Sequence, residues 1–171
     1  GIRHGFQVFW FVLALLVLLW LFREHIFRSN TDIAFLTVLL FAIHPIHTEV
    51  IANVKSRDEI FSILFIGLTF IFFFRYDLWR RKSDMWYCAI SFLLALLSKE
   101  YAVVMLLLLP ASLMIFHKRT LQQVVMPMLP VAVVIFVYFL IRMGAIGGAA
   151  TAPVNISKQD PLNDPYLLSL I

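Results

Sequence analysis

The amino-acid sequence predicts an all-α fold, a polytopic bundle of transmembrane helices. Hydrophobic residues make up 62% of the 171 positions and charged residues only 14%, and the mean hydropathy is +0.92. Soluble domains are about 45–50% apolar and about 25% charged. The charged residues also gather in short clusters between long apolar stretches. Lipid must therefore be the solvent for much of this chain, because a soluble protein this apolar would aggregate.

Six apolar stretches separated by polar clusters predict about six helices, two of them short. They cover residues 6–22, 32–43, 60–74, 85–97, 101–116 and 124–141. Gly, Ala and Pro are frequent from residue 144 onward, a composition that is typical of a loop. The sequence thus predicts a transmembrane helical domain over residues 1–143 and an extramembrane loop over residues 144–171.

Most of the Lys and Arg residues lie in three loops, 23–30, 75–84 and 117–120. Cytoplasmic loops of membrane proteins carry an excess of positive charge, so we expect these loops on the cytoplasmic side. The same bias explains the net charge of +4. We therefore expect membrane lipid, and no nucleic acid, as a partner.

Two of the stretches, 32–43 and 85–97, are too short to cross a bilayer. Each gives a helix of about 18–20 Å, whereas the hydrocarbon core is about 30 Å thick. Each is followed by a polar cluster, His44–Glu49 in the first case and Ser98–Glu100 in the second. Polar residues inside the bilayer are costly unless they pair or face water. We expect a shared aqueous cavity open to the non-cytoplasmic side, the alternative being two local ion pairs.

The densest polar segment is His44-Pro45-Ile46-His47-Thr48-Glu49. Proline disfavours helix at the preceding residue and suits the first turn of a new helix. The sequence therefore predicts a helix break at His44 and a short amphipathic surface helix from Pro45, with Glu49, Asn53 and Arg57 on one face. His47 and Glu49 are candidates for acid–base chemistry or for hydrogen bonds to a hydroxylated substrate.

A second group of charges, Arg57, Asp58 and Glu59, lies at the start of the third stretch. It has the composition of an interfacial helix anchor, but Arg57 could also bind a phosphate, because a guanidinium offers two parallel hydrogen bonds. Lys99 could add a second cation, with Glu100 as its partner or as a ligand of a sugar hydroxyl. The candidate substrate-binding residues are therefore His44, Arg57, Asp58, Lys99 and Glu100.

We expect no cofactor. The lone Cys88 excludes an intrachain disulfide and a cysteine-based zinc site. A divalent metal on His44, His47 and Glu49 is the open alternative, although the HxxH spacing lacks a convincing third ligand. Phosphate-binding loops, dinucleotide fingerprints and serine-nucleophile motifs are absent from the sequence.

Two segments together resemble the TMTC family, membrane proteins with C-terminal tetratricopeptide repeats that are related to the protein O-mannosyltransferases of the GT-C superfamily. They are HPIHTEVIANVKSRDEIFSILF and LLSKEYAVVMLLLLP. The first contains the family's HPxHTE motif and its Arg-x-Asp-like segment at Arg57 and Asp58, and the second contains its SKE motif. Ser56 and Ala102 depart from glycines of the family pattern.

The resemblance implies a partial GT-C-like membrane domain that transfers a sugar, typically mannose, from a polyprenyl-phosphate carrier to a protein hydroxyl. The chemistry would take place on the lumenal or periplasmic side of an endoplasmic reticulum or bacterial inner membrane. Arg57 and Lys99 would stabilise the phosphate leaving group, and Glu49 and His47 would bind hydroxyls. The family's acidic pair and its repeats are not in this sequence, so we expect a fragment whose general base lies outside it.

Two other function classes fit the same residues. Intramembrane Lys, Glu and His beside broken helices also mark transporters and channels. Such a path needs charges at several depths, and the cytoplasmic halves of these stretches are almost uniformly apolar. A non-catalytic membrane-assembly subunit is the third reading.

Overall fold

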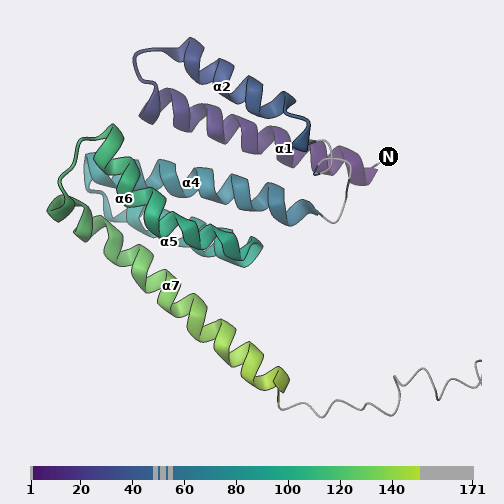
Figure 1. The fold of residues 1–171 in the computed structure, drawn as a ribbon, viewed down its shortest axis with the longest axis vertical. Helices are drawn as coiled ribbons and strands as arrows, with labels where there is room; N and C mark the ends of the chain where they lie inside the picture. The colour runs from purple at the N-terminus through teal and green to yellow at the C-terminus, as the bar shows by residue number, and fades with distance from the viewer. Residues whose placement is uncertain (1, 48–49, 51–52, 54–55, 151–171) are drawn as a thin grey trace, which may run out of the picture. The chain divides into compact units, whose positions relative to one another are not determined.

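The computed structural model describes residues 2–47, 50, 53 and 56–150, and over these residues the chain is helical and contains no strand (Figure 1). Apolar runs between turn-forming polar segments dictate this, because a helix satisfies its own backbone hydrogen bonds in lipid. The helices are α1 (Ile2–Leu21), α2 (Thr31–Ile43), α4 (Arg57–Trp79), α5 (Lys82–Ser98), α6 (Met105–Phe116) and α7 (Leu121–Ala150). A π-helical turn, η1 (Phe22–Ile26), extends α1, and a 3-10 turn, η3 (Glu100–Val104), precedes α6.

The predicted all-α membrane bundle is confirmed. Among the described residues, three segments are long and apolar enough to cross a membrane, Gly5–Ile26, Arg57–Trp79 and Leu121–Gly144. The short helix predicted over 32–43 is α2, which has 13 residues. The helix predicted over 85–97 is longer than expected, because α5 already begins at Lys82.

The helix predicted over 124–141 is too short, and the loop predicted from residue 144 is wrong as far as residue 150, since α7 continues to Ala150. Glycine and alanine both tolerate helical backbone, and no proline lies between residue 143 and Pro153. The extramembrane position predicted for residues 144–171 stays a prediction, and residues 151–171 lie outside the described part. The chain divides into two compact units between Tyr138 and Phe139, and the remaining description concerns the first.

The core of this first unit lies where α4 packs against α1 and α5, which run alongside it in Figure 1. Phe73, Phe74 and Phe92 are almost fully buried there. The helices approach closely at Gly67, where an added Cβ would lie 2.9 Å from Cγ1 of Val17. Phe9, Leu40 and Leu107 point outward and are exposed. Such an apolar exterior matches a protein solvated by lipid.

The two turns that the sequence marks most clearly are formed. His44 ends α2 in extended backbone (φ −64°, ψ 130°), as the following Pro45 predicts. Arg80 ends α4 in the left-handed region (φ 53°), and its N–H donates to the carbonyl of Tyr76. The chain therefore reverses after α4 and brings α5 back along it.

Candidate functional site

Three charged residues from two helices meet at the N-terminal end of α4. Asp58 and Glu59 lie in the first turn of that helix, where carboxylates are favoured by the helix dipole. Lys99 follows the last residue of α5 in extended backbone. Its Nζ lies 3.0 Å from Oδ2 of Asp58 and 2.8 Å from Oε1 of Glu59. The antiparallel packing of α4 and α5 thus joins residues about forty positions apart in the sequence.

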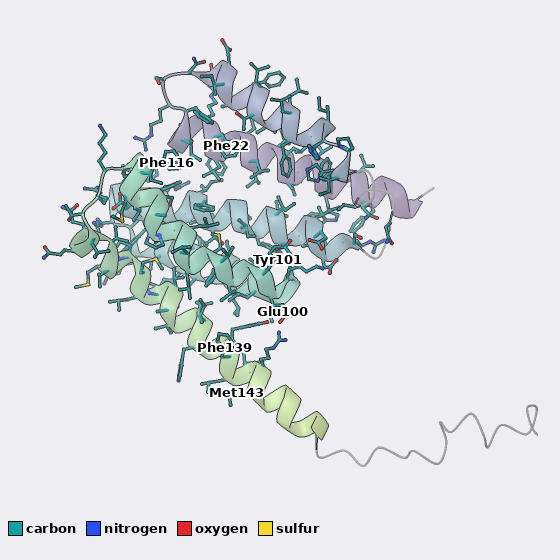
Figure 2. The ribbon with its side chains drawn as sticks, in the orientation of Figure 1. Phe22, Glu100, Tyr101, Phe116, Phe139 and Met143 are labelled. Atoms are coloured by element: carbon teal, nitrogen blue, oxygen red, sulfur yellow. The ribbon has the colours of Figure 1, made fainter. Side chains whose placement is uncertain are left out.

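Tyr101 completes this group, which we call the Lys99 cluster (Asp58, Glu59, Lys99 and Tyr101). Its hydroxyl donates to Oε2 of Glu59 over 2.7 Å, and Figure 2 shows it in η3 beside Glu100. We did not predict a role for Tyr101. Its position two residues after Lys99 could have indicated that it belongs to the same site.

Glu100 was one candidate partner of Lys99, the alternative being that it binds a sugar hydroxyl, but the ion pairs that Lys99 forms in the structure are with Asp58 and Glu59. The reason is the extended backbone at Lys99 (φ −149°, ψ 130°), which lets the side chain reach α4. The hydrogen bonds that Lys99 donates to Glu59 and then to Asp58 raise its pKa above the ordinary value of 10.5. Lys99 is therefore cationic at neutral pH, and its ammonium can donate one hydrogen bond beyond these two.

Arg57 is the first residue of α4. Its guanidinium carbon lies 5.4 Å from the ring centre of Phe6, in a cation–π contact with α1. The Nε atom of Arg57 is buried and has no hydrogen-bond partner. A buried guanidinium N–H without a partner is costly, so an anionic ligand at this position would be stabilising.

The sequence predicted one short amphipathic helix with Asn53 and Arg57 on the same face. The structure contradicts that arrangement. Asn53 is not helical, and Arg57 belongs to α4. The physical reason lies on α1, where the buried side chain of Gln7 donates to the carbonyl oxygens of Val50 (2.6 Å) and Asn53 (2.7 Å). We did not predict this role for Gln7, although a lone amide in an apolar stretch was a signal.

The two histidines lie beside aromatic rings rather than beside Lys99. His44 accepts a hydrogen bond at Nδ1 from the N–H of Ile46 over 3.3 Å. The ring centre of His47 lies 4.2 Å from that of Phe41 and 5.8 Å from that of Phe11. Burial, followed by the charge of His44, lowers the pKa of His47 below its ordinary 6.5. Neutral His47 can thus accept a proton or a hydrogen bond near pH 7.

Glu49 lies outside the described residues, so its predicted role stays a prediction. The same holds for the metal alternative, which depends on Glu49. Within the described part of the chain, no three His, Cys, Asp or Glu residues form a group that could hold a metal ion.

A second charged group, the Asp77 cluster, lies at the opposite end of α4. Asp77 Oδ2 is 2.8 Å from Nδ1 of His117 and 3.1 Å from Nε of Arg119, and Oδ1 is 3.6 Å from Arg80. Nearby, Arg75 pairs with the buried Asp84 at 3.4 Å. These contacts bring the predicted basic loops 75–84 and 117–120 to one end of the bundle.

An apolar cavity of about 310 Å³ lies between α1, α4 and α6. Phe22 and Phe116, labelled in Figure 2, contribute to its lining, together with Gly67 and Phe70. Its walls are almost purely hydrocarbon and aromatic, so the groups that fit it chemically are alkyl or prenyl chains.

The matches to known proteins point to protein mannosyltransferases. Residues 3–142 match the family model described as dolichyl-phosphate-mannose-protein mannosyltransferase. The chain is 37% identical over 68 residues to the human "Protein O-mannosyl-transferase TMTC1", and the aligned part covers 40% of this chain and 8% of that protein. It is 48% identical over 42 residues to "Protein O-mannosyl-transferase F38B6.6" from Caenorhabditis elegans, covering 25% of this chain and 6% of that protein. The matches thus span only a small part of these relatives. No solved structure matches.

Proposed function

This chain belongs to the dolichyl-phosphate-mannose-protein mannosyltransferase family, and from that premise we propose that it forms part of a membrane-embedded mannosyltransferase. The reaction would transfer mannose from a polyprenyl-phosphate carrier to a protein hydroxyl on the lumenal or periplasmic side of the membrane. The observation that carries the proposal is the Lys99 cluster, which holds a cation at the first turn of α4, the turn that begins with Arg57.

Glycosyl transfer from a lipid phosphate leaves negative charge on the departing phosphate. A cation already held in place stabilises that charge without reorganising during the reaction. Asp58 and Glu59 hold Lys99 in this way. The buried and unpartnered Nε of Arg57 provides a second N–H donor. We assign Arg57 and Lys99 to the phosphate of the donor.

The four remaining predicted residues also have proposed roles. His47, whose pKa is lowered, would accept a hydrogen bond from a sugar or acceptor hydroxyl, and His44 would assist it. Glu100 follows Lys99 directly and would bind a sugar hydroxyl. Glu49 is assigned to the same task as His47 on the basis of the HPxHTE motif alone.

The test uses the full-length protein that contains this chain, reconstituted with mannosyl-phosphoryl-polyprenol and an acceptor peptide. We expect Lys99→Ala and Arg57→Ala each to lower mannose transfer by about a hundredfold, the effect typical of losing one group that stabilises developing charge. Lys82→Ala is the matched control, because it removes a cation from the start of α5, at the other end of the bundle.

Transfer rates that stay intact in both variants would disprove the phosphate assignment. If the wild-type protein transfers no mannose but carries a solute across the vesicle membrane, the transporter reading is correct instead. If it does neither, the chain serves in membrane assembly.

A further inference from the structure

A cavity of about 530 Å³ lies at the Asp77 end of the bundle, away from the Lys99 cluster. It is enclosed by the end of α1, the turn η1, the start of α2 and the last turns of α4. The residues that line it are Trp20, Arg23, Glu24, His25, Arg28, Thr31, Arg75, Leu78 and Trp79. Its volume is in the range of small-molecule sites.

The lining carries three arginines and one acidic residue. Arg23 lies 3.9 Å from the carboxylate of Glu24, a long contact between two largely exposed side chains. Arg28 donates through Nε to the backbone carbonyl of Glu24 over 2.8 Å, so its terminal N–H groups are not used in that bond. The cavity therefore has an excess of positive charge.

Arg75 forms the inner side of the cavity. Its guanidinium carbon lies 5.1 Å from the ring of Trp79, and its Nε lies 3.4 Å from the buried carboxylate of Asp84. Next to it, His25 is buried, and its Nδ1 has no hydrogen-bond partner. The arginine is thus fixed in position by packing, as a specific anion site requires.

Two tryptophans place this cavity at the membrane surface. Trp20 is 43% exposed and Trp79 is 55% exposed. Each lies near the end of a segment long and apolar enough to span a membrane. Tryptophan is enriched where the hydrocarbon meets the headgroups. These two side chains therefore favour a position of the cavity at the level of lipid phosphates.

We propose that this cavity binds the phosphate of an anionic lipid headgroup. Arginine pairs with phosphate oxygens through two parallel hydrogen bonds, and basic pockets between transmembrane helices bind phosphorylated headgroups. Arg23, Arg28 and Arg75 supply the donors, and Thr31 lies at the N-terminus of α2, where an anion is favoured. The site is distinct from the proposed catalytic end.

The experiment uses the full chain, reconstituted in phosphatidylcholine vesicles with or without phosphatidylglycerol. Native mass spectrometry after extraction counts the retained lipids, and thermal unfolding measures the stabilisation. We expect the wild-type chain to retain phosphatidylglycerol and to melt at a higher temperature with it. The double variant Arg23→Gln/Arg28→Gln should reduce retention by about tenfold or more.

Lys82→Gln/Lys118→Gln is the matched control, because it removes the same charge from two exposed residues at the same end, outside the cavity lining. Inorganic phosphate is the second probe. Displacement of the lipid by inorganic phosphate assigns recognition to the phosphate alone, and failure of displacement assigns it to the whole headgroup.

Equal loss of the lipid in the control would overturn the proposal, since the attraction would then be a general effect of surface charge. Equal retention of phosphatidylcholine and phosphatidylglycerol by the wild-type chain would overturn it as well, and that outcome does not depend on how well any variant folds.

Discussion

The two ends of α4 hold their charges in different environments. At the N-terminal end, the side chains of Lys99, Asp58 and Glu59 are 30%, 43% and 31% exposed. At the C-terminal end, the side chain of Asp77 is fully buried, and that of His117 is 6% exposed. Both groups join helices through ion pairs, but the carboxylates of the first are partly exposed, whereas the carboxylate of Asp77 is covered by its partners.

We propose that this difference separates a functional site from a group that stabilises the fold. The buried carboxylate of Asp77 is held by two arginines and a histidine, and breaking such a buried ion pair leaves uncompensated charge in a low-dielectric interior. Exposed ion pairs contribute little to stability, because water already solvates both groups. We therefore expect the Asp77 cluster to matter for folding and the Lys99 cluster for function. Four predictions test this comparison.

The largest effect on stability is expected from Asp77→Asn. The substitution leaves Arg80, His117 and Arg119 without their shared carboxylate, and we expect a loss of about 3–5 kcal/mol in the free energy of unfolding. Denaturation in detergent, followed by circular dichroism, measures it. Glu24→Gln is the control, since that carboxylate is exposed. Equal stability of the two variants would show that the Asp77 cluster does not stabilise the fold.

Gly67→Ala tests the packing that connects the two ends. The new Cβ would lie 2.9 Å from Cγ1 of Val17, and a β-branched side chain has little freedom to move aside. We expect a loss of about 1–3 kcal/mol, measured by thermal unfolding. Gly5→Ala should be harmless by comparison, because nothing lies within 4 Å of the added atom. A stabilised Gly67→Ala variant would contradict the close approach of α1 and α4.

Lys99→Met should change stability less than either of those substitutions, although it breaks two ion pairs. Its melting temperature is expected near that of the wild type, whereas mannose transfer by the full-length protein should fall. Measuring both quantities on one preparation separates the two roles. A melting temperature lowered as far as in Asp77→Asn would show that the two clusters are alike, and the functional assignment would lose its basis.

The smallest effect is a pH dependence from His47. Its folded-state pKa lies below the ordinary 6.5, so the unfolded chain takes up the proton more readily. Stability from this group is present above pH 6.5 and is lost as the pH falls toward the folded pKa. His47→Phe, which keeps an aromatic ring beside Phe41, should melt with a weaker acid dependence than the wild type. Identical acid dependence in both proteins would contradict the lowered pKa.

Much of the fold follows from local patterns. Apolar runs of helical length and charged loops predicted the bundle, and Pro45 predicted the end of α2. The HPxHTE and SKE motifs pointed to the family that the comparison then showed. The end of α7 was misjudged, because glycine and alanine do not by themselves stop a helix.

The partners of the charged residues depended on the tertiary structure. The apolar surroundings of Lys99 in the sequence predicted that it needs a counter-charge. Its neighbour Glu100 was as good a candidate for that counter-charge as Asp58 or Glu59. Only the antiparallel packing of α4 and α5 decided between them. In the same way, Gln7 and Tyr101 acquire their roles from residues more than forty positions away. The sequence by itself thus determined where helices form and which charges must be satisfied, because these depend on local periodicity and solvation. Which groups satisfy those charges was decided by the packing of helices that are distant in the sequence.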